Sequence, residues 1–156
     1  MEATGGSQGR VSRYEQNPLK GNRILVVDDE DGFRMFVNDI LSDHGYAVTE
    51  ANSGEDALRK VHEKEFDLLI TDIKMPGMSG LELLCKVKMS YPNVEVIVIS
   101  GSSDPEFIEY SKTHGAADFI VKSLQFDRLL LSVVGRLQNR RLNCTLPVLR
   151  RQISLE

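Results

Sequence analysis

The stretch Leu68-Leu69-Ile70-Thr71-Asp72-Ile73-Lys74-Met75-Pro76-Gly77 contains the clearest indication of the fold. An apolar run bounded by turn-forming residues predicts a short strand that is buried on both faces, with Asp72 at its carboxyl end. In open α/β sheets, ligands bind at that edge. A single Asp at a strand end is also a common helix cap, so its role depends on which other side chains reach the same edge.

Four more short runs rich in β-branched residues accompany this strand, and helical spacing of apolar residues follows each of the five. The other predicted strands are 24–27, 46–50, 94–100 and 117–121, and the predicted helices are 33–44, 53–61, 81–91, 104–114 and 126–143. Strict alternation predicts parallel strands joined by right-handed crossovers, with helices on both faces. For five units the common arrangement is a three-layer α/β/α fold of the flavodoxin-like, doubly wound type, with a five-stranded parallel sheet in the order 2-1-3-4-5.

Two of the helix starts carry specific capping signals. Ser53 is the predicted N-cap of the second helix, since a Ser side chain can accept a hydrogen bond from the first turn. Asp104 is the predicted N-cap of the fourth helix, where Pro105 follows at the first helical position.

Length and composition limit the class of protein. A chain of 156 residues is long enough for one domain with a real core. No apolar run approaches the roughly 20 residues that a membrane helix requires, and the first 22 residues lack the apolar segment of a secretory signal. Two cysteines form neither a metal-ligand pattern nor a disulfide framework. These features predict a cytoplasmic protein that does not associate with membranes.

Charge divides the chain into three parts. Residues 23–135 carry 11 Lys/Arg and 20 Asp/Glu, whereas residues 136–156 carry five Arg and one Glu. The acidic body argues against direct binding of nucleic acid by this domain. We expect a flexible N-terminal arm at 1–22, one folded domain at 23–137, and a basic C-terminal extension or linker at 138–156.

Five polar side chains are predicted to meet at the carboxyl edge of the sheet. The first strand supplies Asp28 and Asp29, the third Asp72, the fourth Ser100 and the fifth Lys122. Three carboxylates in one small site would repel each other unless a cation joined them, and oxygen ligands alone favour Mg²⁺, with Mn²⁺ as an alternative. A divalent ion, a lysine and a hydroxyl together suit phosphoryl chemistry.

Residues 23–137 resemble a response-regulator receiver domain of bacterial two-component signal transduction, of the kind found in chemotaxis regulators. The matching stretches, in order and with the spacing of the family, are VVDDE at 26–30, DIKMPGMSG at 72–80, SG at 100–101 and GAADFIVK at 115–122.

The resemblance implies a phosphorylatable receiver of a phosphorelay. Asp72 matches the residue that accepts a phosphoryl group from a sensor histidine kinase or a histidine phosphotransfer protein. Lys122 matches the lysine that pairs with that group. The implied metal site for Mg²⁺ is formed by the side chains of Asp29 and Asp72 and the main-chain carbonyl of Lys74, and Asp28 matches the carboxylate that holds the ion through water. The implied reaction is self-phosphorylation and dephosphorylation, so the chain is not expected to be a turnover enzyme.

The resemblance also implies a conformational switch. Ser100 and Phe119 match the switch pair, and phosphorylation is expected to repack the face formed by the fourth strand, the 104–114 helix and the fifth strand. An effector or a second copy of the chain is the expected partner of that face. Phe119 lacks the hydroxyl of the tyrosine that is more common in the family.

The loop after the fifth strand departs from the family pattern. The family usually has a proline in a cis peptide after the lysine, whereas Ser123 follows Lys122 here. Because a cis bond without proline costs about 3 kcal/mol, we expect a trans bond.

Other classes of protein remain open on the sequence alone. A receiver domain used only for binding is one alternative, and Ser123 is the reason to consider it. An Asp-nucleophile phosphatase would place a second Asp two residues after the nucleophile, where Lys74 stands. In a flavodoxin, Asp28 and Asp29 would repel the cofactor phosphate. The sequence also leaves open whether the domain acts alone or within a larger regulator.

Overall fold

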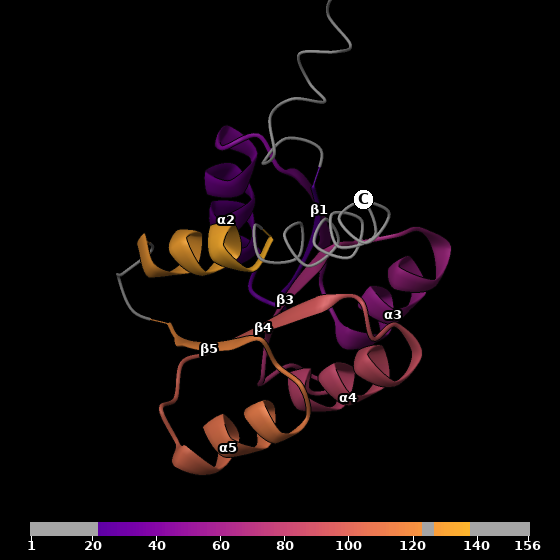
Figure 1. Cartoon of the computed structure of the whole chain (residues 1–156), viewed down its shortest axis with the longest axis vertical. Helices are drawn as coiled ribbons and strands as arrows, with labels where there is room; N and C mark the ends of the chain where they lie inside the picture. Colours follow the sequence, from indigo (N-terminus) through magenta and orange to yellow (C-terminus); the bar gives the residue numbers. More distant parts are fainter. Residues whose placement is uncertain (1–21, 123–126, 138–156) are drawn as a thin grey trace, which may run out of the picture.

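The computed structural model describes residues 22–122 and 127–137, in which five strands alternate with five helices (Figure 1). The elements are β1 (Arg23–Val27), α2 (Asp31–Asp43), β2 (Ala47–Ala51), α3 (Gly54–Glu63), β3 (Leu68–Asp72), α4 (Gly80–Ser90), β4 (Glu95–Ser100), α5 (Pro105–Thr113), β5 (Asp118–Val121) and a last helix over 127–137.

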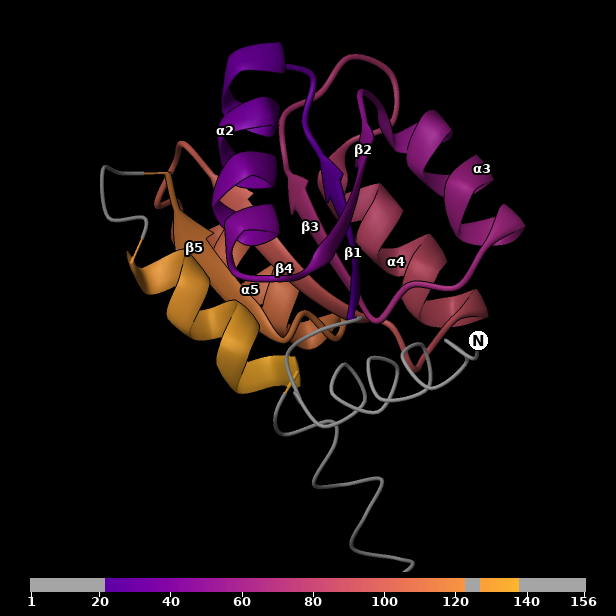
Figure 2. The ribbon, with the colours of Figure 1, turned by 90° about the horizontal axis from the view of Figure 1, so that it is seen from above.

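The strands form a single parallel sheet in the order β2-β1-β3-β4-β5. This order confirms the predicted doubly wound fold. Helix α2 and the 127–137 helix cover one face, and α3, α4 and α5 cover the other (Figure 2). The chain reverses its direction of winding between β1 and β3, which opens the switch-point edge at which ligands bind in such sheets.

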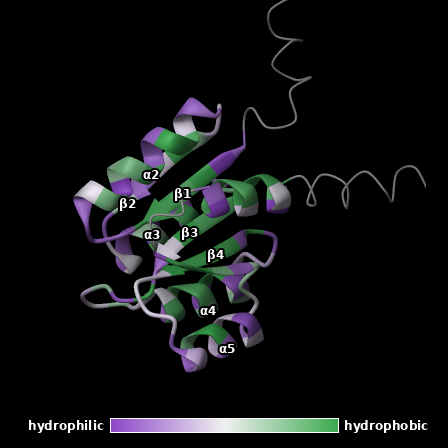
Figure 3. Cartoon of the chain, turned by 90° about the vertical axis from the view of Figure 1, so that its left-hand side faces the viewer, coloured by the Kyte–Doolittle hydropathy of each residue, from purple (hydrophilic) through white to green (hydrophobic). Residues whose placement is uncertain are grey.

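Each face of the sheet has its own hydrophobic core. Along β1, Leu25 and Val27 face α3 and α4, whereas Ile24 and Val26 face α2 and the 127–137 helix. Figure 3 shows the hydrophobic residues concentrated on the strands and on the helix faces that meet them. Because both faces are covered, the inner strands are apolar at nearly every position, which is the pattern that predicted them.

The two predicted helix caps are confirmed. The Ser53 hydroxyl accepts a hydrogen bond from the amide of Asp56 at 3.1 Å, and Asp104 accepts one from the amide of Glu106 at 3.0 Å. Pro105 occupies the first turn of α5. Each cap satisfies an amide that has no partner inside the helix.

The predicted bounds differ from the observed ones at several ends. Strand β2 begins at Ala47, because Tyr46 turns into the core beside Leu41 before the strand starts. The last helix was predicted over 126–143; the described part covers 127–137, and the remainder lies outside the described residues.

Two other predictions depend on residues outside the described ranges. The division into an arm at 1–22, a receiver at 23–137 and an extension at 138–156 stays a prediction, as does the trans bond between Lys122 and Ser123. Within 22–122 and 127–137, no helix combines the length and the apolar character needed to cross a membrane.

Candidate functional site

The carboxyl edge of the sheet brings three carboxylates together. Asp28 follows directly on β1 and Asp72 is the last residue of β3, while Asp29 begins the turn into α2. Their carboxylate oxygens lie within 4.8 Å of one another. The structure therefore places at one point the acidic residues that the sequence analysis had assigned to a single site.

Lys122, just beyond β5, lies between two of these carboxylates. Its Nζ donates to Oδ2 of Asp28 at 2.8 Å and to Oδ2 of Asp72 at 3.0 Å. The Phe33 ring of α2 lies over the same ammonium, 4.3 Å from ring centroid to Nζ. With 17% of its side chain exposed, Lys122 is a sheltered cation inside an acidic cluster.

Main-chain amides hold the remaining oxygens of the two buried carboxylates. Oδ1 of Asp28 accepts from the amide of Glu30 at 2.9 Å, and Oδ1 of Asp72 accepts from the amide of Ile73 at 2.7 Å. Each carboxylate therefore has one oxygen fixed by the backbone and one bonded to Lys122, whereas Asp29 is exposed.

The electrostatic state of the site follows from burial and pairing. Burial raises the pKa of Asp28, whose side chain is 1% exposed, although the hydrogen bonds from Lys122 and Glu30 act in the opposite direction. Burial alone would lower the pKa of Lys122, but the hydrogen bonds and charges of Asp28 and Asp72 outweigh it and raise that pKa. The lysine is therefore held in its charged form at neutral pH.

Ser100 and Phe119 lie on the neighbouring strands β4 and β5. The buried Ser100 hydroxyl accepts from the amide of Ser102 at 3.1 Å. Phe119 is also buried, in the core that faces α4 and α5, and it pairs with Val98 across the two strands. Ser100 therefore ends the strand next to the one that carries Asp72, whereas Phe119 lies in the core, three residues before Lys122.

The loop after β3 carries Lys74, and hydrogen bonds fix the end of this loop that precedes α4. The amide of Met78 donates to Oε1 of Glu55 in α3 at 2.9 Å, and the amide of Gly80 donates to the carbonyl of Ile73 at 2.8 Å. Gly77 adopts a φ of 77°, a left-handed conformation that favours glycine. Lys74 itself is exposed on this loop.

Sequence reasoning missed two side chains that hold the site loops: Glu55, which anchors the loop after β3, and Arg34, which contacts the loop after β1. Nothing in the local pattern distinguishes either residue from other charged residues on helix surfaces. Their partners lie 23 and 6 residues away along the chain, and only the packed fold brings them together.

The donor set fits a hard divalent cation. Among the described residues, the acidic cluster offers oxygen ligands from three carboxylates, whose like charges a cation would join. Mg²⁺ and Mn²⁺ prefer carboxylate and carbonyl oxygens, whereas zinc sites usually include His or Cys.

The parallel sheet, its switch point and the site of three aspartates with one lysine define a class of α/β phosphoryl-acceptor domain. Residues 24–134 match the family model of the response regulator receiver domain. The chain belongs to this family and is a receiver domain of two-component signal transduction. Receiver domains are generally signal-transduction modules rather than enzymes.

This chain matches nearly the whole length of one curated relative and only a small part of another. The chain is 36% identical over 111 residues to the chemotaxis protein CheY of Thermotoga maritima, covering 70% of this chain and 92% of that protein. It is 38% identical over 120 residues to the transcriptional regulatory protein ZraR of Klebsiella oxytoca, covering 77% of this chain. The matched region is only 27% of the length of ZraR.

A solved structure also matches the fold and the sequence. The response regulator protein TrrA from Thermotoga maritima, crystallised in complex with Mg(2+)-BeF, superposes with a TM-score of 0.69 and 36% sequence identity. The match covers 74% of this chain and 98% of TrrA.

Proposed function

We propose that Asp72 accepts a phosphoryl group from the phosphohistidine of a sensor histidine kinase or a histidine phosphotransfer protein. The observation that carries this proposal is the position of Lys122, whose Nζ contacts both Asp28 and Asp72 beside a third carboxylate. An acceptor carboxylate, a fixed cation and a set of hard ligands are the parts that phosphoryl transfer requires.

In the transfer, a carboxylate oxygen of Asp72 attacks phosphorus as the bond from phosphorus to the histidine nitrogen breaks. The leaving imidazole regains its electron pair and takes up a proton. Lys122, already bonded to Oδ2 of Asp72, stabilises the negative charge on the phosphoryl oxygens as they arrive. The backbone amide of Ile73 holds the other oxygen of Asp72, so the acceptor keeps one orientation.

The proposed metal site consists of the side chains of Asp28, Asp29 and Asp72 and the main-chain carbonyl of Lys74, with Mg²⁺ the favoured ion and Mn²⁺ an alternative. When bound, the ion supplies positive charge that offsets the negative charge of the transferring group. The similarity to TrrA, crystallised with Mg(2+)-BeF, supports this assignment.

Phosphorylation is proposed to shift a pre-existing equilibrium through Ser100 and Phe119. A phosphoryl dianion on Asp72 attracts the Ser100 hydroxyl and draws the end of β4 inward, and Phe119 then repacks. Because both residues border the face formed by β4, α5 and β5, that face is the proposed docking surface for an effector or for a second copy of the chain.

Intact-mass measurement after incubation with acetyl phosphate tests the proposal. We expect the wild-type chain to gain one phosphoryl group only when Mg²⁺ is present, and Asp72→Asn to gain none. Asp43→Asn, which alters an exposed aspartate at the end of α2, is the matched control and should behave as wild type. A folded wild-type chain that gains no mass would favour the alternative of a receiver used only for binding.

A further inference from the structure

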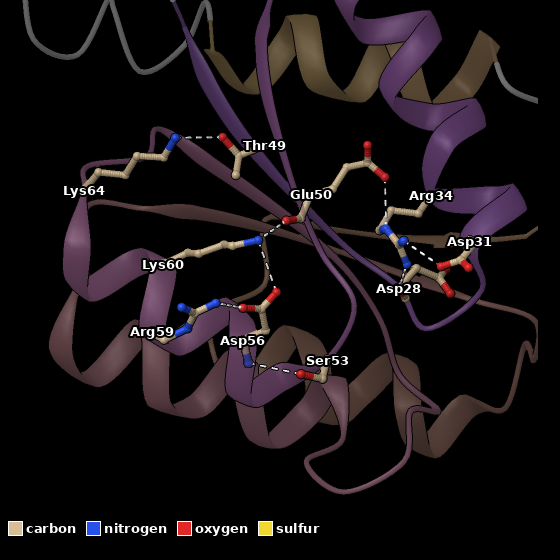
Figure 4. Close-up of polar contacts among 10 residues, drawn as sticks. All are labelled: Asp28, Asp31, Arg34, Thr49, Glu50, Ser53, Asp56, Arg59, Lys60 and Lys64. Carbon is tan, nitrogen blue, oxygen red and sulfur yellow. Dashed lines mark hydrogen bonds and ion pairs between the residues drawn. The ribbon is translucent and has the colours of Figure 1, made fainter.

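Arg34 lies in the first turn of α2, with its guanidinium directed back toward the end of β1 (Figure 4). Nη1 donates to the main-chain carbonyl of Asp28 at 2.7 Å, and Nε donates to Oε1 of Glu50 at 2.9 Å. Nη2 contacts Oδ1 of Asp31 at 2.6 Å. Only 13% of the side chain is exposed, so the group is held by three acceptors in a sheltered position.

Glu50 is a fixed support for this arginine. It belongs to β2 and pairs with Val26 of β1, and its second carboxylate oxygen accepts from Nδ2 of Asn38 at 2.7 Å. Its main-chain carbonyl accepts a hydrogen bond from Lys60 of α3 (Figure 4). Contacts with β1 and α3 hold the backbone of Glu50, and Asn38 of α2 holds its carboxylate, so the carboxylate offers the guanidinium of Arg34 an acceptor in a fixed position.

The carbonyl that Arg34 binds belongs to the peptide joining Asp28 to Asp29. A different orientation of that peptide would change the backbone dihedral angles of Asp28 and Asp29, and so the positions of two of the three carboxylates in the acidic cluster. The loop has further restraints: the amide of Asp28 donates to the carbonyl of Ala51 at 3.1 Å, and the amide of Glu30 donates to Oδ1 of Asp28. Arg34 adds a charged donor to these restraints, because its Nη1 binds the Asp28 carbonyl.

We propose that Arg34, supported by Glu50, is a positioning residue that orients the Asp28–Asp29 peptide and thereby aligns two carboxylates for a divalent cation. This inference rests on the proposed metal site and adds two residues that do not contact the ion. Hydrogen-bonding partners behind metal ligands commonly contribute 10- to 100-fold to metal affinity, because they fix the ligand orientation.

Geometry can be separated from charge at this position. Lysine keeps the positive charge of Arg34 but lacks the planar fork that reaches a carbonyl and a carboxylate together. If the role of Arg34 were only electrostatic, Arg34→Lys would leave cation affinity unchanged. Glu50→Gln keeps the shape of the support but removes its charge, so it weakens the support without altering Arg34.

The test measures the dissociation constant for Mn²⁺, by electron paramagnetic resonance, and for Mg²⁺, by calorimetry, on the full chain. We expect Arg34→Lys and Glu50→Gln each to weaken binding by about 10-fold, at temperatures where circular dichroism shows a folded protein. Arg59→Lys is the matched control, since Arg59 forms its ion pair with Asp56 on the exposed side of α3, and its affinity should equal that of wild type.

A second readout does not need the ion. The amide nitrogen of Asp29 belongs to the peptide whose carbonyl Arg34 binds, so its NMR chemical shift should move in Arg34→Lys and in Glu50→Gln but not in Arg59→Lys. Combining Arg34→Lys with Glu50→Gln should weaken binding less than the product of the two single effects, because both remove one interaction.

The outcomes distinguish this inference from the proposed function. Wild-type binding and phosphorylation together with unchanged affinity in both variants would overturn the positioning role alone. Absence of divalent binding by the wild-type chain would instead overturn the proposed metal site. If Arg34→Lys did not fold, the Asp29 amide shift of Glu50→Gln in the absence of the ion would still decide the question, since this variant leaves the arginine in place and the readout does not depend on cation affinity.

Discussion

Gly80 lies so close to Asp72 that a Cβ atom at position 80 would be 1.8 Å from the main-chain carbonyl oxygen of Asp72. The amide of Gly80 also donates to the carbonyl of Ile73 at 2.8 Å. Helix α4, capped by the Ser79 hydroxyl, therefore begins directly against the end of the strand that carries the acceptor. Only a residue without a side chain permits this approach.

Gly80→Ala should be strongly destabilising. The methyl group would overlap main-chain atoms, which cannot move without displacing either β3 or α4, so we expect a loss of about 3 kcal/mol or more in the free energy of unfolding. Urea denaturation measures this loss. Gly32→Ala is the control: a Cβ at position 32 of α2 meets no atom within 4 Å, and alanine there should raise stability by about 0.5–1 kcal/mol. Equal stability of Gly80→Ala and wild type would contradict the close approach.

Lys122→Met should separate phosphoryl transfer from cation binding. Without the ammonium, the charge on the arriving phosphoryl group loses a stabilising partner, and we expect phosphorylation of Asp72 by acetyl phosphate to slow by about 10²-fold or more. Affinity for Mg²⁺ should be at least as high as in wild type, because a positive charge bonded to Asp28 and Asp72 competes with the ion. Mass spectrometry and calorimetry measure the two quantities.

The control for that experiment is Lys112→Met, at an exposed position near the end of α5, which should leave both quantities unchanged. Loss of cation affinity in Lys122→Met, with the fold intact, would show that the lysine arranges the carboxylates rather than competing for them.

Ser100→Ala should accept the phosphoryl group on Asp72 but undergo a smaller conformational change at the face formed by β4, α5 and β5. In the described conformation the Ser100 hydroxyl accepts from the amide of Ser102, and the proposed switch requires that hydroxyl to turn toward Asp72. We expect normal mass gain and smaller amide shift changes along β4, α5 and β5 in NMR spectra. Ser90→Ala, at the exposed end of α4, should respond as wild type. Full-sized shift changes in Ser100→Ala would assign the switch to other residues.

The acidic cluster and its lysine could be predicted from the sequence, because the topology of the sheet alone brings these residues to one edge. Asp28 and Lys122 are 94 residues apart, yet parallel strands in the order 2-1-3-4-5 place both at one edge whatever the details of packing. The support given by Arg34 and Glu50 could not be predicted in the same way. Their contact depends on the rotation of α2 about its axis and on its distance from β2, which are set by packing of the whole layer.

Element ends were the less predictable part of the fold. Tyrosine is common in β-strands, but Tyr46 is buried in the core before β2 starts at Ala47. A strand begins where its hydrogen-bonded partner begins, and the register that pairs Arg23 with Ala47 is a property of two segments together. Capping residues such as Ser53 were predictable, because their hydrogen bonds stay within a single turn.

The carboxylate of Asp56 in α3 provides a test by pH. Arg59 and Lys60 both contact it (Figure 4), and the hydrogen bond from Arg59 is the main cause that lowers the pKa of Asp56. For an acid whose pKa is lower in the folded than in the unfolded chain, the stabilisation is complete above the unfolded value and is lost as the pH falls through the folded value.

Asp56→Asn should therefore destabilise the protein at neutral pH by about 0.5–1 kcal/mol, the range of partly exposed ion pairs. The difference from wild type should shrink as the pH falls below about 4, the pKa of an aspartate in the unfolded chain. Urea denaturation over a range of pH measures it. Asp43→Asn is the control: a carboxylate at the carboxyl end of α2 opposes the helix dipole, so its removal should not lower stability at any pH. A deficit in Asp56→Asn that stays constant with pH would trace the loss to packing of the amide rather than to the charge.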